Sequence, residues 1–452
     1  MKIKKMTNKF IQFLLAIVTA FILFPSTARA DIQTAMQAET QTEIQKPWTY
    51  FADTSWYDET KQEFHIKTPA QFAALAVLVN QGNDFDGKKI ILDADIDLSG
   101  HNWISIGNPE KWYFISQHRW FSGTFDGQNH CISNLTTDSS SYCHGLFGSV
   151  QFGTIKNVKI RDACIYNTGD TSRDCYIGIL ADYVRGASIL GSSATGKIIN
   201  TSTDAEDIGG LVGQCQCNTK IVGCYSKIQL DNISDDKYTA VGGLVGSWFD
   251  YATDAMISHC FFDGSIHCKG NPFVGGILGL SLDTSTKINR CFTATTDIIC
   301  NKSDKVAWIK NAAWITNTET NNSVSDCYWP AITKEKACKP NISPVNKFNG
   351  IWWLSKDQEF DASNCGTAIA NFNDKKFVDK LNNKLVPGVA WVSGTTHPTF
   401  VYDDKKNITA SDSEIEAAKL KIYGSFDDYS KVIPAQSIKI TRLSKLLKKA
   451  FK

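Results

Sequence analysis

Gly-Gly-Leu-Val-Gly stands at residues 209–213 and returns unchanged at 242–246. Related copies occur before and after these two, as Gly145-Leu146-Phe147-Gly148, Gly178-Ile179-Leu180-Ala181 and Gly276-Ile277-Leu278-Gly279. Their closing residues, at 148, 181, 213, 246 and 279, lie 33, 32, 33 and 33 residues apart, and a degenerate copy at 312–315 follows after 36. A fixed period of this length is typical of repeat proteins built from one supersecondary unit.

Each copy is followed by two more short apolar runs. In the third repeat these are Ile221-Val222, which precedes Cys224, and Lys227-Ile228-Gln229-Leu230. Gly, Ser, Asn and Asp residues separate the runs, and none has the length and 3.6-residue spacing of a helix. Three short strands in each repeat of about 33 residues predict an all-β protein. We expect a right-handed parallel β-helix with small helix-containing caps, in which each coil covers the next.

The Gly-Gly-Leu-Val-Gly copies are similar to those of the GLUG repeat family of bacterial exported and cell-surface β-helix proteins. The resemblance covers about residues 120–330, and Phe121 to Gly127 resembles the entry coil of GLUG-type surface proteins. It implies a solenoid on an exported protein. Segments of this family also occur beside metallopeptidase domains. The chain departs from the pattern at Ala181 and at 312–314, which suggests coils under relaxed packing or coils that face a cap.

The first thirty residues have the order of a secretory signal peptide. A basic segment at 2–9 precedes an apolar run at 10–24, and Ala28-Arg29-Ala30 supplies a small-residue cleavage site. The run is shorter than the roughly 20 residues that span a bilayer, which favours cleavage over an uncleaved anchor helix. We expect an exported protein that is secreted, cell-surface or periplasmic. Residues 31–60 are expected to form an N-terminal linker.

Residues 61–120 are expected to form the N-terminal cap and the first strands. Thr68-Pro69-Ala70-Gln71 has the residues of a capping box, and the side chains that follow on one helical face are Phe72, Leu75, Ala76 and Val79. A strand is predicted over 88–99, with Asp93, Asp95 and Asp97 outward. A calcium-binding EF-hand loop would need Gly at its sixth position and Glu at its twelfth, where this sequence has Leu98 and Ile104. The three carboxylates therefore predict a solvated strand face, with a metal site as the alternative.

The coils are assigned to 121–330 and the C-terminal cap to 331–403. Within this cap we expect a helix over 374–385 and a last strand near 397–400. Residues 404–452 are expected to be a polar linker followed by a basic amphipathic tail at 439–452. The tail is interpreted as a solubilising segment, and weak contact with an anionic membrane or cell-wall polymer is the alternative.

Charge and motifs limit the classes of function. Without the signal peptide and the basic tail the body is mildly acidic, which argues against nucleic acid as a partner. The sequence has no His-Glu-x-x-His, no Gly-x-Ser-x-Gly elbow and no phosphate loop, and its eight histidines are scattered. We therefore predict no catalytic residue, no metal and no cofactor. A polysaccharide lyase or hydrolase stays open as the alternative, although it rests on fold analogy alone.

Fourteen cysteines in an exported chain would suggest disulfides, but four of them occupy one repeat position. The residues at that position, called the stack slot below, are Val158, Ser192, Cys224, Cys260, Cys291 and Cys327. Because Val, Ser and Cys replace one another at this position, we predict an inward stack of small residues. We expect its thiols to be free, because the parallel Cβ vectors of stacked coils do not suit a disulfide. On this interpretation Cys260→Ser costs about 1–3 kcal/mol and Cys260→Val costs less. The pairing of the other ten cysteines stays open.

Two loops carry aromatic residues that the coils do not need. They are Trp112, Tyr113, Trp120, Trp248 and Tyr251. Exposed rings stack on sugars and anchor protein partners, whereas the alternative is extra core folded over a coil edge. We interpret the five as candidate ligand-binding residues. The predicted function is adhesion or the binding of an extracellular glycan or protein.

Overall fold

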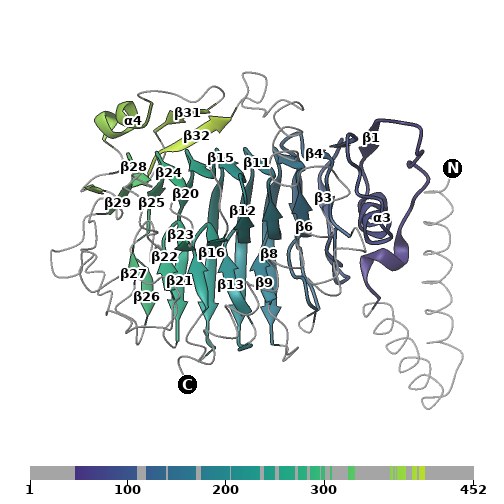
Figure 1. The fold of residues 1–452 in the computed structure, drawn as a ribbon, viewed down its shortest axis with the longest axis horizontal. Coiled ribbons are helices and arrows are strands. Elements are labelled where there is room, and N and C mark those ends of the chain that lie inside the picture. The colour runs from purple at the N-terminus through teal and green to yellow at the C-terminus, as the bar shows by residue number, and fades with distance from the viewer. Residues whose placement is uncertain are drawn as a thin grey trace, which may run out of the picture.

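The computed structural model describes residues 46–402 except for a set of gaps, at 109–118, 139–140, 169–174, 204, 235–238, 250–253, 270–272, 282–285, 296, 301–305, 308–323, 331–366, 370–371, 373, 383–388 and 394–396. These residues form a parallel β-solenoid of about 5 turns (Figure 1), which confirms the predicted all-β solenoid. The signal peptide and the 404–452 segment lie outside the described residues. No helix in the described part of the chain is long and apolar enough to cross a membrane.

Four parallel sheets run along the solenoid. Over residues 147–307 the chain passes through the fourth, first, second and third sheets in that order in each of five coils. The first sheet contains β1 (Glu63–Ile66), β2 (Lys89–Leu92), β4 (Thr124–Asp126), β7 (Thr154–Lys156), β11 (Ser188–Leu190), β15 (Lys220–Val222), β19 (Met256–Ser258), β24 (Lys287–Asn289) and β28 (Val324–Ser325). The second contains β3 (Ile96–Asp97), β5 (Cys131–Ser133), β8 (Lys159–Asn167), β12 (Ser193–Asn200), β16 (Tyr225–Asn232), β20 (Phe261–Phe262), β21 (Ser265–Cys268), β25 (Phe292–Thr293), β26 (Ile298–Cys300), β29 (Tyr328–Pro330) and β30 (Thr367–Ile369).

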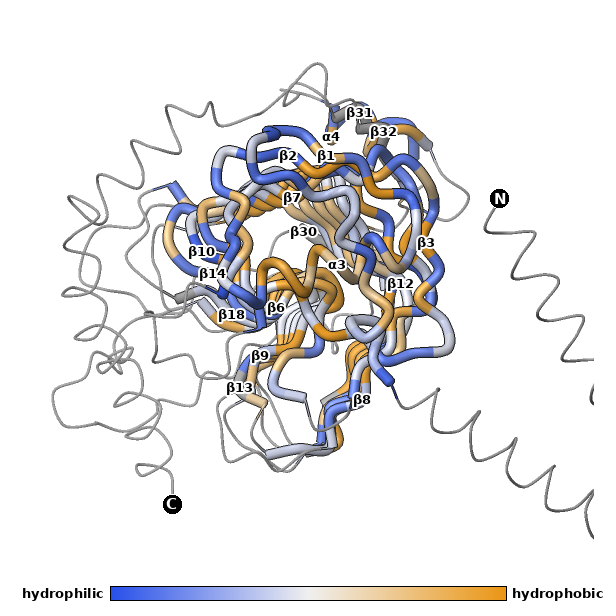
Figure 2. Tube along the Cα trace, turned by 90° about the vertical axis from the view of Figure 1, so that its right-hand side faces the viewer, coloured by the Kyte–Doolittle hydropathy of each residue, from blue (hydrophilic) through white to orange (hydrophobic). Residues whose placement is uncertain are grey.

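The third and fourth sheets have five strands each. The third contains β9 (Cys175–Gly178), β13 (Ala205–Gly209), β17 (Ala240–Gly242), β22 (Phe273–Gly275) and β27 (Val306–Ala307). The fourth contains β6 (Phe147–Gln151), β10 (Ala181–Arg185), β14 (Val212–Gln216), β18 (Val245–Phe249) and β23 (Leu278–Ser281). The end view shows the four sheets around one continuous interior (Figure 2), and the largest hydrophobic cluster fills it.

The Gly-Gly-Leu-Val-Gly motif is a corner between two strands, so the prediction of three strands per repeat is wrong. Strand β13 ends at Gly209 and β14 begins at Val212. A Cβ on Gly209 would overlap the carbonyl oxygen of Val212, and one on Gly210 would overlap the carbonyl oxygen of Gly243 in the next coil. The first glycine is therefore required by the bend within the coil, and the second by the stacking between coils.

A second corner repeats between the first and second sheets. One residue per coil adopts a left-handed conformation there, directly before the stack slot, and the φ values lie between 50° and 63°. These residues are Asn157, Gly191, Gly223, His259, Arg290 and Asp326. An L side chain adopts this conformation only at a cost. Because the conformation recurs at this corner with very different side chains, the fold itself requires it.

The strand register corrects the predicted alignment around Ala181. Ala181 pairs with Phe147 and Val212, and Tyr183 pairs with Ser149 and Gln214. Asp182 therefore occupies the last glycine position of the motif, which Ala181 was predicted to fill. The equivalent residues in the neighbouring coils are Gly148 and Gly213.

The predicted N-terminal helix is α3 (Pro69–Asn80), and it covers the first coil. The Thr68 side chain accepts the Gln71 N–H at 3.2 Å. The Gln71 side chain accepts the N–H of Lys67 at 3.1 Å, one residue earlier than in a standard capping box. The four side chains predicted for its apolar face are all buried.

Two other predictions at this end are wrong. The strand predicted over 88–99 is divided into β2 and β3 because the chain turns there from the first sheet to the second, although Asp93, Asp95 and Asp97 are exposed as expected. Residues 46–60 also differ from the predicted linker, since the 3-10 helix η1 (Trp48–Phe51) contacts α3. The Trp48 Nε1–H donates to the carbonyl of Leu98 at 2.8 Å. The partly buried rings of Trp48 and Trp56 give this segment an apolar surface that a flexible linker lacks.

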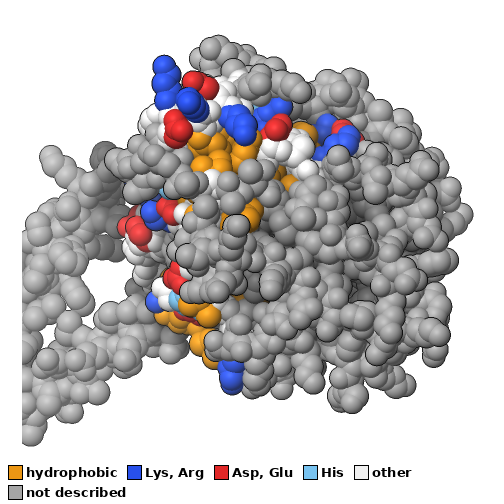
Figure 3. Space-filling model, turned by 90° about the vertical axis from the view of Figure 1, so that its left-hand side faces the viewer, with side chains coloured by type: hydrophobic (Ala, Val, Ile, Leu, Met, Phe, Trp, Pro, Cys, Tyr) orange, Lys and Arg blue, Asp and Glu red, His pale blue; other side chains and the backbone are white. Residues whose placement is uncertain are grey.

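At the other end, α4 (Lys375–Asn382) and the antiparallel hairpin of β31 (Val389–Val392) and β32 (Thr399–Tyr402) form a separate unit, called the C-terminal cover below. It lies against the side of the last coils (Figure 1). Its apolar side chains pack on the outer face of the second sheet and form a second hydrophobic cluster there. Figure 3 looks at this end and shows hydrophobic side chains beneath charged ones.

Candidate functional surface

The aromatic residues predicted to bind a ligand are not brought together on a described surface. Trp112, Tyr113 and Tyr251 lie outside the described residues. Trp248 is completely buried, and Trp120 is only 8% exposed. The prediction that Trp248 binds a ligand is wrong, because its strand pairs it with Cys215 and Ser281 at a position that points into the core.

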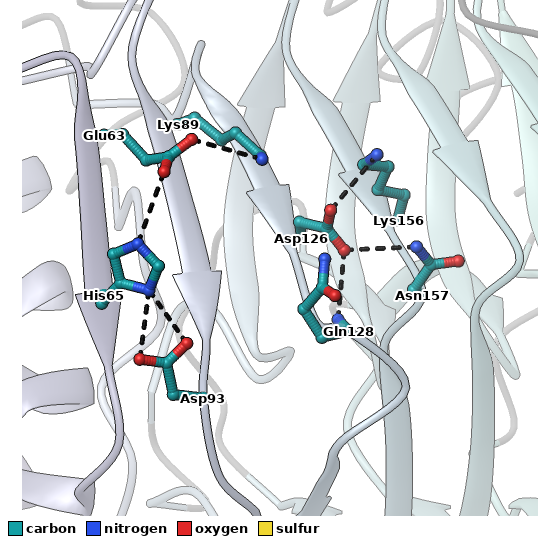
Figure 4. Close-up of polar contacts among 8 residues, drawn as sticks. All are labelled: Glu63, His65, Lys89, Asp93, Asp126, Gln128, Lys156 and Asn157. Atoms are coloured by element: carbon teal, nitrogen blue, oxygen red, sulfur yellow. Dashed lines mark hydrogen bonds and ion pairs between the residues drawn. The ribbon is translucent and has the colours of Figure 1, made fainter. Parts of the chain in front are cut away.

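Polar side chains on the outer face of the first sheet bridge neighbouring coils (Figure 4). The His65 ring lies between the Asp93 carboxylate, at 2.9 Å from Nδ1, and the Glu63 carboxylate, at 3.4 Å from Nε2. The hydrogen bond to Asp93 raises the pKa of His65. Lys89 Nζ approaches Glu63 at 3.4 Å. These groups connect the first two strands of the sheet.

Further along the same face, the Asp126 carboxylate joins one corner to the next. It lies 3.2 Å from Lys156 Nζ and accepts a hydrogen bond from Asn157 Nδ2 at 3.2 Å (Figure 4). It also accepts the Gln128 N–H at 3.1 Å. Asp126 is buried, so these contacts replace the water that its carboxylate would otherwise hold.

A different surface is exposed on the second sheet, where β8, β12, β16, β21 and β26 lie side by side. One register position there, called the exposed row below, carries Tyr166, Ile199, Asp231, His267 and Ile299. Tyr166 is 39% exposed and Ile299 51% exposed, and the nearby Ile233 is 49% exposed. Five large hydrophobic side chains are exposed in the described residues, and three of them lie along this face of the sheet.

Charged groups lie among these apolar side chains. His267 Nδ1 is 3.2 Å from an Asp231 oxygen, and its Nε2 is 2.9 Å from an Asp297 oxygen, so one ring connects three coils. The hydrogen bond to Asp297 raises the pKa of His267, because both carboxylates stabilise the imidazolium. The Lys197 ammonium lies 5.0 Å from the centre of the Tyr166 ring. The surface is therefore flat and partly apolar, with its charges already arranged in fixed positions.

The exposed row was not among the features predicted from the sequence, although a signal for it was present. Inward residues of the five strands, such as Ile165, Ile198 and Leu230, are each flanked by outward residues. When the outward residues next to these positions are aligned across the repeats, they form a row of apolar and charged side chains. Its composition differs from coil to coil, and for that reason no recurring residue type marks it in the sequence.

A chain of hydrogen bonds connects the third and fourth sheets. Tyr183 Oη donates to Gln216 Oε1 at 2.6 Å, and Gln216 Nε2 donates to Gln214 Oε1 at 3.1 Å. Gln214 Nε2 then donates to the Asp207 carboxylate at 2.6 Å. All four side chains are buried. This arrangement satisfies polar groups beside the motif corner, and it offers no exposed group for chemistry.

Asp182 also has a structural role at the motif corner. Its buried carboxyl group accepts the backbone N–H groups of His144, Gly145 and Gly178 at 2.8 to 3.1 Å. Burial raises its pKa to about 8, although the N–H groups act in the opposite direction. The carboxyl group therefore takes up a proton more readily in the folded protein than in the unfolded chain.

We expect Asp182→Gly to remove a pH dependence of stability. A raised folded pKa gives stability that is complete below the unfolded value, near 3.9, and that is lost as the pH rises toward 8. The variant leaves three N–H groups unpaired, so its free energy of unfolding at pH 5 should be about 1–3 kcal/mol lower than that of the wild type. That difference from the wild type should shrink toward pH 8. Urea unfolding of both proteins at several pH values measures it, and a difference that does not change with pH would contradict the protonated carboxyl group.

The stack slot lies in the interior, and each side chain contacts the coil before it. The N–H of Val158 donates to Ser192 Oγ at 3.2 Å, that of Ser192 to Cys224 Sγ at 3.4 Å, and that of Cys224 to Cys260 Sγ at 3.4 Å. None of the four cysteines forms a disulfide. Burial raises the pKa of the Cys224 and Cys291 thiols well above the ordinary value, so they are uncharged.

These hydrogen bonds reverse the predicted order of the Cys260 substitutions. Ser192 donates to the carbonyl of Leu190 at 2.9 Å, just as Cys260 donates to that of Ser258 at 3.1 Å. A serine at 260 would find both partners, whereas a valine would leave the Cys224 N–H unpaired. We expect Cys260→Val to cost about 1–3 kcal/mol and Cys260→Ser less. Urea unfolding ranks the two variants.

We also expect the stack thiols of the purified protein to be free. Alkylation in denaturant without reduction, followed by mass spectrometry, should find Cys224, Cys260, Cys291 and Cys327 fully modified. A linked peptide that joins two of these cysteines would contradict this prediction.

The described residues contain no group of three or more His, Cys, Asp or Glu side chains placed to hold a metal ion. No family model and no curated protein matches the sequence. Among solved structures, the chain is similar to "a putative immunoglobulin A1 protease from Bacteroides ovatus", with 19% identity and a TM-score of 0.51 over 77% of this chain and 95% of the other. An "IgA1 Protease" matches at 19% identity and a TM-score of 0.43, over 59% of this chain and 19% of the other. At this identity the likeness to the Bacteroides ovatus structure shows a shared fold and nothing further.

Proposed function

We propose that this protein is an exported, non-catalytic β-solenoid that binds an extracellular glycan or protein ligand through the outer face of the second sheet. The observation that carries the proposal is the exposed row, where apolar side chains surround the Asp231–His267–Asp297 bridge. Proteins expose such apolar side chains together at sites of binding more than elsewhere. Backbone pairing holds β8, β12, β16 and β21 on both sides and β26 on one side, so binding would require little ordering of the backbone.

Several observations favour a binder over an enzyme. The outer carboxylates of the first sheet are engaged in bridges between coils, and the sequence has no His-Glu-x-x-His motif. The names of the two structural neighbours suggest peptidase activity on immunoglobulin A1, but a likeness of fold at 19% identity does not transfer it. Immunoglobulin A1 therefore belongs in the test as one candidate ligand and one candidate substrate.

The test is a binding screen of the purified chain on a glycan array and on immobilised extracellular proteins that include immunoglobulin A1. The proposal expects a retained ligand whose binding falls roughly tenfold in Tyr166→Ala and in Ile299→Ser. Tyr50→Ala is the matched control, because Tyr50 is 65% exposed at the other end of the chain. Equal losses in the control, or no retained ligand, would contradict the proposal.

The same samples test the enzyme alternative. Polysaccharides incubated with the chain, with and without calcium, should show no new reducing ends and no unsaturated ends that absorb in the ultraviolet. Immunoglobulin A1 should keep an intact heavy chain. Cleavage of any of these polymers would replace the binding proposal with an enzymatic one.

A further inference from the structure

The C-terminal cover is attached to the solenoid through side chains. Among the described strands, β31 and β32 pair only with each other. Among the described residues, no backbone hydrogen bond joins α4, β31 or β32 to a coil. The cover can therefore separate without breaking a strand ladder, which distinguishes it from β30, the edge strand of the second sheet.

The cover lies on a row of aromatic rings on the outer face of the second sheet. The Tyr225 and Phe261 rings stack at 4.8 Å, and the Phe261 and Phe292 rings at 5.1 Å, with nearly parallel planes. Tyr328 continues the row in the next coil. From the cover, Trp391 lies 5.4 Å from Phe292, and Phe377 lies 4.9 Å from Tyr328. Phe261, Phe292 and Tyr328 are buried by this contact, whereas Tyr225 is partly exposed.

One ion pair crosses the edge of this apolar contact. His397 Nε2 of the cover lies 3.2 Å from the Asp263 carboxylate, which also binds Lys227 Nζ at 2.9 Å. His397 Nδ1 lies 2.8 Å from the carbonyl oxygen of Pro398. A carbonyl and a carboxylate both accept hydrogen bonds, so only the imidazolium, with a proton on each nitrogen, satisfies both partners.

We propose that protonated His397 fastens the C-terminal cover to the solenoid, and that loss of this proton loosens the cover and uncovers the aromatic row. The neutral ring can donate to only one of its two acceptors, so it loses its hydrogen bond either to Asp263, which keeps Lys227, or to the Pro398 carbonyl. The charges that act on the ring are those of Asp263, which favours the imidazolium, and Lys227, which opposes it. The Phe261 and Phe292 rings complete its surroundings at 5.1 and 5.7 Å.

The direction of the pH dependence follows from the pKa of His397. Burial acts to lower this pKa, but the hydrogen bonds to Asp263 and Pro398 outweigh burial and raise it above the ordinary value. A raised folded pKa gives a contribution that is complete below the unfolded value, near 6.5, and that is lost as the pH rises through the folded value. The cover is therefore held most firmly in mildly acidic medium and loosens in alkaline medium.

Hydrogen–deuterium exchange of the full chain, read by mass spectrometry, tests the proposal. The measured quantity is the protection of peptides that contain α4 and β31, after correction for the intrinsic dependence of exchange on pH. It should fall about fivefold between pH 5.5 and pH 8.5, which is the scale of one partly exposed ion pair. Peptides from β12 and β16 in the same digest report whether the solenoid itself changes.

Two variants separate His397 from the other histidines. In His397→Gln the protection of the cover should be low at both pH values and should no longer depend on pH. His101→Gln is the matched control, since the hydrogen bond of its ring within the described part of the chain is to a backbone carbonyl, that of Lys46, at 3.1 Å. This control should keep the fivefold fall. An equal fall in His397→Gln, or constant protection in the wild type, would overturn the proposal.

Discussion

Gly243→Ala is expected to destabilise the protein by about 3 kcal/mol or more. A Cβ at this position would overlap the carbonyl oxygen of Gly276 and the Phe262 ring. The oxygen belongs to the backbone of the next coil, so it cannot move without separating two hydrogen-bonded strands. The Gly243 N–H donates to the carbonyl of Gly275 at 3.0 Å, and this contact would lengthen first. Urea unfolding monitored by far-ultraviolet circular dichroism measures the loss.

The control for this variant is Gly82→Ala. Gly82 has φ +103° and open space around the position of a Cβ, so alanine meets only backbone strain there. We expect a cost of about 1 kcal/mol. Equal costs for the two variants would mean that the coils adjust to a methyl group, and the explanation of the motif by coil stacking would then be wrong.

Trp248→Ala is expected to cost about 3–5 kcal/mol, the range for removing a large buried aromatic side chain. Trp248 is among the largest completely buried side chains, and it lies in the main hydrophobic cluster. Its Nε1–H has no hydrogen-bond partner in the described part of the chain. Trp248→Phe should therefore cost much less than Trp248→Ala, because phenylalanine keeps most of the volume and removes the unpaired N–H.

Tyr50 provides the exposed aromatic control for the Trp248 variants. Tyr50→Ala, at an exposed position, should change the free energy of unfolding by about 0.5 kcal/mol or less. A Trp248→Ala protein with wild-type stability would show that the ring is not part of the core. The ligand-binding role that the sequence suggested for Trp248 would then need to be considered again.

The capping residues and the spacing of the glycine motif predicted the N-terminal helix and the stacked coils correctly. Thr68 and Gln71 mark the start of α3 because capping depends on residues within one turn. The Gly-Gly-Leu-Val-Gly spacing predicts the stacked coils, because a repeated unit with one bare face must be covered by its neighbour. The exposed row was not predicted, because its members are more than thirty residues apart and no single residue type recurs in every coil.

The sequence by itself determined that this protein is a parallel β-solenoid, and it located the stack slot and the N-terminal helix. Only the tertiary structure decided that Asp182 takes a glycine position, that Trp248 is core and that the C-terminal cover lies on the side of the coils. The physical reason is the range of the interactions. Periodicity and capping depend on near neighbours along the chain, whereas register, burial and the His397–Asp263 contact depend on which distant residues the completed coils bring together.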